Sequence, residues 1–171
     1  MGGRLFHVSE EAGLQRFEPR PNHRVSGEMV WAVDEAHLVN FLTPRDCPRV
    51  TYGLGPKTTA DDIARFLSPG LRRVVAFEAG WLDRTRAVTL YIYEMPVETF
   101  ELELQDAGYW ISRSAVTPIG CEIVHDALAA LAEAGAEVRV LQDFWPLCDA
   151  VAASTLEFSI IRKDAARPRR V

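Results

Sequence analysis

The stretch Arg4-Leu5-Phe6-His7-Val8-Ser9-Glu10 decides the fold, together with Met29-Val30-Trp31-Ala32-Val33-Asp34 further along the chain. Both segments are short and rich in β-branched and aromatic residues, so we predict strands over residues 4–9 and 29–33. Each strand ends at a polar side chain. We therefore expect these two strands to direct polar groups beyond the edge of a sheet.

The rest of the chain mixes further strands with helices. Strands are predicted over residues 49–53, 72–79, 86–94, 99–105, 109–113 and 137–141, and helices over residues 35–42, 60–67, 121–134 and 143–153. Residues 10–27 are predicted to form a surface loop, and Trp81–Arg84 to connect two strands of a hairpin. Residues 155–162 fit neither pattern. This irregular order favours an α+β fold over a doubly wound parallel sheet.

Length and composition are those of one folded domain. The chain has 171 residues, of which 48% are hydrophobic and 25% charged. We predict a single α+β domain over residues 1–163 and a flexible basic tail over residues 164–171. The net charge of −5 gives no electrostatic reason to bind nucleic acid or an anionic membrane. With neither a membrane-spanning stretch nor a signal-peptide pattern, the sequence predicts a cytoplasmic protein.

Common catalytic and metal-binding motifs are missing from the sequence. The three cysteines are widely spaced and are predicted to be free, buried thiols, and the four histidines fall on separate predicted elements. We therefore predict no metal site. No phosphate-binding glycine loop, nucleophile elbow or H-E-x-x-H motif is present, so the sequence leaves the catalytic residues unknown.

His7 and Ser9 are the first candidates for binding a ligand. Both point to one face of the first strand because side chains alternate along a strand. A neutral imidazole donates from one nitrogen and accepts at the other, which suits a sugar hydroxyl. The alternative is a structural histidine that bonds to the long loop.

Trp31 and Arg20 are the other candidates. The indole of Trp31 offers a flat face for stacking and an N–H donor, although a core position is the alternative. Arg20 lies between two prolines on a stiff loop, where it suits a phosphate or a carboxylate, and a solvated loop arginine is the alternative.

Several segments resemble an uncharacterised bacterial domain family over nearly the whole chain. They are Leu5-Phe6-His7-Val8-Ser9-Glu10-Glu11, Val30-Trp31-Ala32-Val33-Asp34-Glu35-Ala36-His37-Leu38, Pro44-Arg45-Asp46-Cys47-Pro48-Arg49-Val50 and Ser154-Thr155-Leu156-Glu157-Phe158-Ser159-Ile160-Ile161-Arg162. This resemblance implies no known activity.

A more distant resemblance does imply one. His7-Val8-Ser9 is similar to the H-x-[S/T] element of the ADP-ribosyltransferase fold, and Trp31-Ala32-Val33-Asp34 stands where that fold has an aromatic residue, usually tyrosine. The resemblance implies a bent, split antiparallel β core with flanking helices and NAD as the cofactor. It implies that His7 binds the ribose hydroxyls, the backbone of Val8 binds the nicotinamide amide, and Trp31 stacks on the nicotinamide ring. The family's catalytic glutamate has no counterpart near Tyr109-Trp110-Ile111-Ser112.

These observations leave three functional hypotheses. The first is an ADP-ribosyltransferase-like enzyme that cleaves NAD or transfers ADP-ribose. The second is a non-catalytic domain that binds a nucleotide or another small ligand through His7, Ser9, Trp31 and Arg20. The third is a small hydrolase or isomerase in which His7 meets a glutamate of residues 99–105. The sequence leaves the oligomeric state unknown.

Overall fold

The computed structural model describes residues 3–22 and 26–169, and it confirms the α+β class with helices and two sheets. The chain divides into two compact units, which are formed by residues 1–41 with 89–125 and by residues 42–88 with 126–171. Each unit is therefore built from two separate stretches of the chain. The single domain that the sequence suggests stays a prediction.

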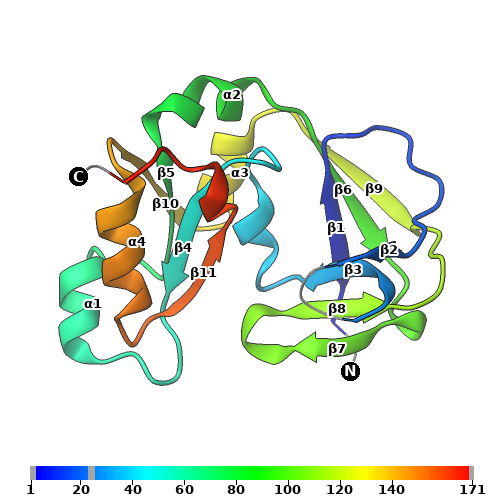
Figure 1. Ribbon diagram of the computed structural model, residues 1–171, viewed down its shortest axis with the longest axis horizontal. Helices are drawn as coiled ribbons and strands as arrows, with labels where there is room; N and C mark the ends of the chain where they lie inside the picture. Colours follow the sequence, from blue (N-terminus) through cyan, green and yellow to red (C-terminus); the bar gives the residue numbers. More distant parts are fainter. Residues whose placement is uncertain (1–2, 23–25, 170–171) are drawn as a thin grey trace. The chain divides into compact units, whose positions relative to one another are not determined.

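The first unit holds an antiparallel sheet (Figure 1). Within the described residues its strand order is β7-β8-β3-β1-β6-β9, and the short β2 pairs with β3. Its strands are β1 (Leu5–Ser9), β2 (Arg20–Pro21), β3 (Glu28–Asp34), β6 (Leu90–Met95), β7 (Glu101–Leu104), β8 (Tyr109–Ser112) and β9 (Gly120–Val124). Short 3₁₀ helices follow at η1 (Leu38–Phe41), η3 (Val97–Thr99) and η4 (Gln105–Ala107). The strands predicted over residues 4–9 and 29–33 are confirmed as β1 and β3.

One face of this sheet carries the core of the first unit. The core residues are Leu5, Phe17, Val30, Ala32, Tyr93, Met95, Phe100 and Val116, all of them buried. The loop between β1 and β2 joins this core because Phe17 pairs with Val116 through both main-chain hydrogen bonds. The long loop predicted after the first strand therefore lies against the sheet and covers part of it.

The second unit holds a four-stranded sheet with the order β10-β5-β4-β11. Its strands are β4 (Arg49–Gly53), β5 (Arg73–Glu78), β10 (Ala136–Leu141) and β11 (Glu157–Ile161). β10 and β5 run parallel, whereas the other pairs are antiparallel. This parallel pair departs from the wholly antiparallel core that the sequence suggests, and it is possible because a long crossover separates the two strands.

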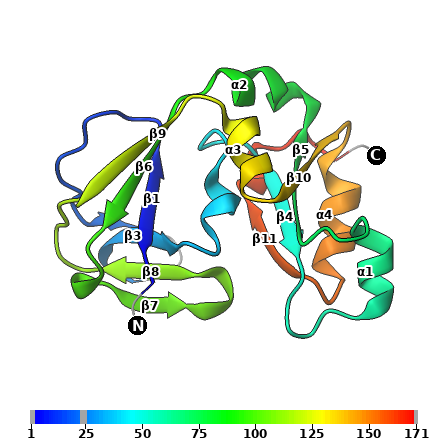
Figure 2. The same cartoon turned by 180° about the vertical axis from the view of Figure 1, so that it is seen from behind.

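Helices cover one face of the four-stranded sheet. The helices of this unit are α1 (Ala60–Phe66), α2 (Leu82–Ala87), α3 (Ala127–Glu133) and α4 (Phe144–Ala152), with 3₁₀ turns η2 (Ala79–Trp81) and η5 (Lys163–Ala165). Figures 1 and 2 show α1 and α4 on the same side of the sheet. Their buried residues pack against Val50, Tyr52, Val74 and Ala76 to form the second core. Apolar packing thus fixes α1 and α4 to that face.

Three predicted elements are wrong. Trp81–Arg84 does not join a hairpin, because it belongs to η2 and α2, while β5 and β6 lie in different sheets. The helix predicted over residues 121–134 is instead strand β9 followed by α3, which begins after the N-cap Asp126. Residues 35–42 form only the short 3₁₀ turn η1. Residues 155–162, which fitted no pattern, contain strand β11.

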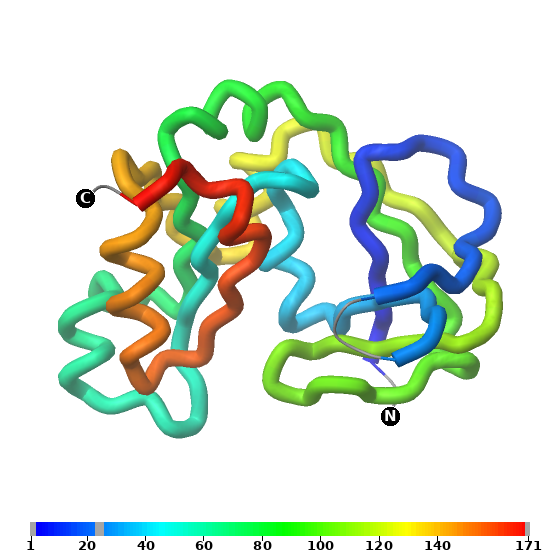
Figure 3. The backbone as a smooth tube through the Cα atoms, viewed as in Figure 1, coloured from blue at the N-terminus to red at the C-terminus, as the bar shows by residue number. Residues whose placement is uncertain are grey.

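The C-terminal segment reaches α4 within the second unit (Figure 3). The Arg169 guanidinium makes two hydrogen bonds to Asp149 and lies 4.1 Å from the centroid of the Trp145 ring. The indole N–H of Trp145 donates to the main-chain oxygen of Arg167. The flexibility proposed for residues 164–171 stays a prediction, and residues 170–171 lie outside the described part of the chain.

The cysteines and the helix lengths bear on two further predictions. All three cysteines are free, as predicted, and Cys47 and Cys148 are buried; the prediction of a buried thiol is wrong for Cys121, which is exposed on the edge strand β9. No helix in the described part of the chain combines the length and the apolar character that crossing a membrane requires.

Candidate functional site

His7 lies where the hydrogen-bonded pairing between β1 and β3 ends. The register places Phe6 opposite Val33, and no later pair follows among the described residues. The Nδ1 atom of His7 lies 2.8 Å from the main-chain oxygen of Trp31. Because a carbonyl oxygen only accepts, Nδ1 donates, and Nε2 is then the acceptor of the neutral ring. His7 thereby ties β1 to β3 at the residue that the sequence selects as a stacking platform.

The loop after β1 covers the face of the sheet on which His7 lies. The His7 and Phe17 rings are 4.8 Å apart between centroids, and Phe17 makes an edge contact with Tyr93. The Tyr93 hydroxyl donates to the main-chain oxygen of Glu11 at 2.8 Å. The Ser9 hydroxyl accepts from the Glu11 N–H at 3.0 Å. His7 and Ser9 therefore both contribute to holding this loop.

Trp31 points to the opposite face of the sheet from His7. Phe6 and Val33 share a face because they lie directly opposite each other, and Trp31 shares it because it lies two residues before Val33. His7 follows Phe6 and so points to the other face. The His7 ring bonds the main chain of Trp31, but the side chains of His7 and Trp31 lie on opposite faces of the sheet.

The remaining sequence candidates divide between the same two faces. Arg20 on β2 lies opposite Met29 of β3, which places its exposed side chain on the face of Trp31. Ser9 lies on the face of His7, and Val8 lies opposite Ile92 of β6. The five residues selected from the sequence therefore do not converge on one face.

Three half-buried aromatic residues, Trp31, Phe41 and Tyr109, form what we call the aromatic group. The Trp31 and Tyr109 rings meet edge to face, with centroids 5.8 Å apart and planes at 86°. Phe41 meets Tyr109 at 6.1 Å. The Nε1 atom of Trp31 is buried and has no hydrogen-bond partner among the described residues. A buried donor without a partner lowers the stability of the fold by about 1–3 kcal/mol, so an acceptor for this N–H would be stabilising.

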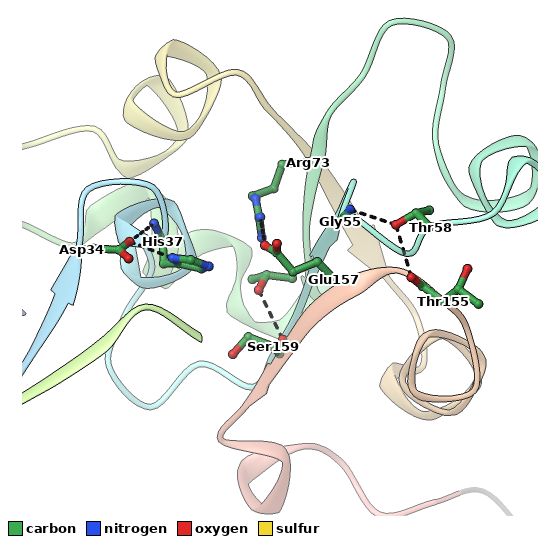
Figure 4. Close-up of polar contacts among 9 residues, drawn as sticks. Asp34, His37, Gly55, Thr58, Arg73, Thr155, Glu157 and Ser159 are labelled. Carbon is green, nitrogen blue, oxygen red and sulfur yellow. Dashed lines mark hydrogen bonds and ion pairs between the residues drawn. The ribbon is translucent and has the colours of Figure 1, made fainter. Parts of the chain in front are cut away.

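Asp34 and His37 form an acid–imidazole pair at the end of β3 (Figure 4). The Asp34 Oδ1 atom lies 2.7 Å from Nδ1 of His37 and also accepts the main-chain N–H of His37 at 3.0 Å. Both side chains are largely shielded, with 14% of His37 and 30% of Asp34 exposed. One carboxyl oxygen therefore fixes both the ring and the backbone of His37.

Gly108 packs against Asp34 and His37. Its φ of +62° is a backbone conformation that favours glycine. Its main-chain oxygen accepts a hydrogen bond from the Asp34 N–H at 3.0 Å. A Cβ at this position would overlap Nδ1 of His37 and lie 2.6 Å from Oδ2 of Asp34. The next residue, Tyr109, belongs to the aromatic group. The acid–imidazole pair and the aromatic group are thus built from the same segments of the first unit.

Charged residues surround the Phe6 side of this face. Arg4 lies over the Phe6 ring at 4.8 Å and donates to Glu94 from Nε at 3.0 Å and from Nη2 at 2.9 Å. The hydrogen bond from Arg4 lowers the pKa of Glu94 below its usual value. Both signs of charge are therefore present beside Phe6.

The second unit has its own polar arrangement on the face of its sheet opposite α1 and α4. Arg73 of β5 reaches Glu157 of β11 across the intervening strand β4, with Nη2 and Oε1 2.5 Å apart (Figure 4). Gly53 lies between them in the register, and a Cβ there would overlap the main-chain oxygen of Arg72. Because Gly53 has no side chain, the Arg73 and Glu157 side chains can meet over the middle strand β4.

A cluster of hydroxyl hydrogen bonds, which we call the hydroxyl clip, joins two loops just before the start of β11. The Thr58 hydroxyl accepts from the Gly55 N–H at 2.8 Å and lies 3.2 Å from the main-chain oxygen of Thr155, to which it donates (Figure 4). Asp62 accepts from both the N–H and the hydroxyl of Thr155, and these bonds lower the pKa of Asp62. We assign this clip to holding the loops before α1 and β11 together.

The comparison with known families places the chain. The model of a family of unknown function, DUF6886, matches residues 6–166. The chain belongs to the DUF6886 family. The match confirms the prediction that most of the chain belongs to an uncharacterised domain family, and it includes His7 and the acid–imidazole pair. No curated protein and no solved structure matched the chain.

The sequence reasoning missed the acid–imidazole pair. It assigned neither Asp34 nor His37 a binding or catalytic role. The available signal was an aspartate at a strand end followed three residues later by a histidine, a spacing that lets both groups meet across one turn. Among the described residues, no three or more His, Cys, Asp or Glu side chains gather to form a possible metal site.

Proposed function

We propose that this member of the DUF6886 family is an ADP-ribosyltransferase-like protein that binds NAD on the first unit. The observation that carries the proposal is the aromatic group with the unpaired indole N–H of Trp31. A flat heteroaromatic ring such as nicotinamide stacks favourably on such side chains, by about 1–3 kcal/mol for a nucleic-acid base.

The end of the pairing between β1 and β3 supports the same proposal. The ADP-ribosyltransferase resemblance implies a split β core whose two motif strands hold the ligand. Here β1 and β3 stop pairing directly after Phe6 and Val33, and His7 bonds the main chain of Trp31. In this proposal His7 acts on the ligand through Trp31, by fixing the strand that carries the stacking ring.

Thermal unfolding with and without millimolar NAD tests the proposal. A ligand that binds only the folded protein raises the unfolding midpoint by mass action, with about 2.7 kcal/mol of stabilisation at a ligand concentration 100 times Kd. We expect the wild type and Trp81→Phe, a control at a half-buried tryptophan of the second unit, to show the shift. We expect Trp31→Leu to lose it. An equal shift in Trp31→Leu would reject this site.

The same unfolding experiment with two fragments of NAD shows which part of the ligand contacts Trp31. Nicotinamide mononucleotide keeps the ring and its ribose, while ADP-ribose lacks the ring. If the aromatic group stacks on nicotinamide, Trp31→Phe weakens the mononucleotide and leaves ADP-ribose unchanged. Protection by ADP-ribose alone would move the binding site away from Trp31.

A further inference from the structure

The acid–imidazole pair has the arrangement of a general base. Asp34 accepts from Nδ1 of His37, which holds the neutral ring in the tautomer whose Nε2 carries the lone pair. The main-chain bond to the same carboxyl oxygen restricts the ring further. An imidazole that is oriented by a carboxylate is a recurrent way to remove a proton from an attacking group.

Capping of the turn does not by itself account for this pair. As a cap, Asp34 needs only the main-chain N–H of residue 37, which any residue but proline provides. The imidazole adds a second bond to the same oxygen and is shielded, with 14% of its side chain exposed. Gly108 then leaves room for both groups, since a Cβ would overlap the ring nitrogen. The local packing is built around this histidine.

The pair lies beside the aromatic group. Gly108 contacts Asp34 and His37, and Tyr109, the next residue, packs on Trp31 and on Phe41. Phe41 ends the same short turn η1 that follows His37. A ring held by the aromatic group therefore has a carboxylate and an imidazole as chemical neighbours in the same unit.

We propose that His37 is the general base of an NAD glycohydrolase reaction, with Asp34 as its positioning residue. This inference rests on the proposed binding of NAD and adds the reaction class and the acceptor, which is water. In this inference the acidic group is Asp34, at the end of β3. The ADP-ribosyltransferase resemblance instead requires a glutamate on a late strand.

The reaction balances with water as the only co-reactant. The water oxygen forms a bond to C1′ of the nicotinamide ribose, and the bond between C1′ and the nicotinamide nitrogen breaks with its electron pair going to that nitrogen. Nε2 of His37 accepts the proton that the water loses and later releases it to solvent. The products are ADP-ribose and nicotinamide. The Asp34 carboxylate offsets the positive charge on the imidazolium.

The test measures nicotinamide release and NAD binding on the same full-length preparations. We expect the wild type to release nicotinamide and His37→Ala to do so about 10²–10⁴ times more slowly, the usual contribution of a general base. His125→Ala, at an exposed histidine, is the matched control and keeps the wild-type rate. Added imidazole restores part of the rate in His37→Ala, which a purely structural role would not produce.

Asp34→Asn provides a second variant in case His37→Ala folds poorly. Its amide oxygen still accepts both the main-chain N–H and the Nδ1–H of residue 37, so the cap and the tautomer are retained, while the negative charge that stabilises the imidazolium is lost. We expect a lower kcat with an unchanged KM. Wild-type turnover by His37→Ala, or an NAD-induced midpoint shift without nicotinamide release in the wild type, overturns the inference and leaves the binding proposal intact. Absence of any NAD-induced shift in the wild type rejects both proposals.

Discussion

The imidazole of His7 bonds the main-chain oxygen of Trp31 at the point where β1 and β3 cease to pair. Beyond this point a side chain replaces the ladder hydrogen bond that a continuous sheet would provide. The consequence is that the position of Trp31 depends on the identity of residue 7. Binding and stability are therefore linked through this one contact.

His7→Ala should lower the free energy of unfolding by about 1–3 kcal/mol, because the half-buried carbonyl of Trp31 loses its donor. Urea unfolding measures the change, and His125→Ala is the control, expected to stay within about 0.5 kcal/mol of the wild type. Equal stability of His7→Ala and the wild type would mean that the bond does not hold β3 in place.

Gly108→Ala should cost more stability than Gly135→Ala. Both glycines have positive φ, +62° and +74°, so both substitutions carry a similar backbone penalty of about 1–2 kcal/mol. Only Gly108 has the acid–imidazole pair against it, whereas a Cβ at Gly135 would meet nothing within 4 Å. The difference between the two urea midpoints isolates the packing of the pair. Identical midpoints would show that Asp34 and His37 can move aside freely.

The bridge between Arg73 and Glu157 should show measurable coupling. A double-mutant cycle with Arg73→Met and Glu157→Gln should give about 1–2 kcal/mol, since the two side chains are only 15% and 28% exposed. The exposed pair of Arg86 and Asp83, 3.8 Å apart, is the matched comparison and should couple by less than about 0.5 kcal/mol. Coupling that is no larger at Arg73 would remove the case for a built bridge across Gly53.

Burial of the Cys47 thiol should make stability fall at alkaline pH. Desolvation raises its pKa from 9.0 to about 12, so the folded protein holds this proton more tightly than the unfolded chain does. The contribution is complete below pH 9.0 and is lost as the pH rises from 9.0 toward 12. Between about pH 8 and pH 10.5, the wild type should lose roughly 1–2 kcal/mol more than Cys47→Ala. Parallel pH curves for the two proteins would contradict this assignment.

The same burial predicts a pattern of thiol reactivity. Native protein should react with Ellman's reagent at Cys121, which is exposed on β9, and at Cys47 and Cys148 only after unfolding. One equivalent of rapid reaction followed by two on adding denaturant is the expected course. Rapid native reaction of a second thiol would show that one of the buried cysteines is accessible.

Much of the local structure could be predicted because short signals agreed with tertiary packing. The β-branched and aromatic runs of β1, β3 and β4 mark strands, and α4 begins at the start of the helix predicted over residues 143–153, with Asp143 as its N-cap. The failure at residues 121–134 has a clear cause. Ile123 and Val124 match a helical period, but they pair with β6 as strand β9, and Asp126 caps the helix that follows. A short apolar run does not by itself distinguish the two structures.

The candidate site was only partly predictable for a different reason. His7 and Trp31 were selected from their strands, but the register that sends their side chains to opposite faces depends on how β1 and β3 pair. Gly108 is far from Asp34 in sequence, so its contact with the acid–imidazole pair arises only from the pairing of β8 with β3. Long-range pairing, rather than local pattern, built this part of the molecule.

Nuclear magnetic resonance of the indole N–H groups tests the central claim most directly. The chain has four tryptophans, and labelling them with ¹⁵N gives one indole signal each, with Trp31 assigned by Trp31→Phe. Binding of NAD on the aromatic group predicts that the Trp31 signal moves on titration while those of Trp81 and Trp145 in the second unit stay in place. A Trp31 signal that does not move at millimolar NAD would contradict the account.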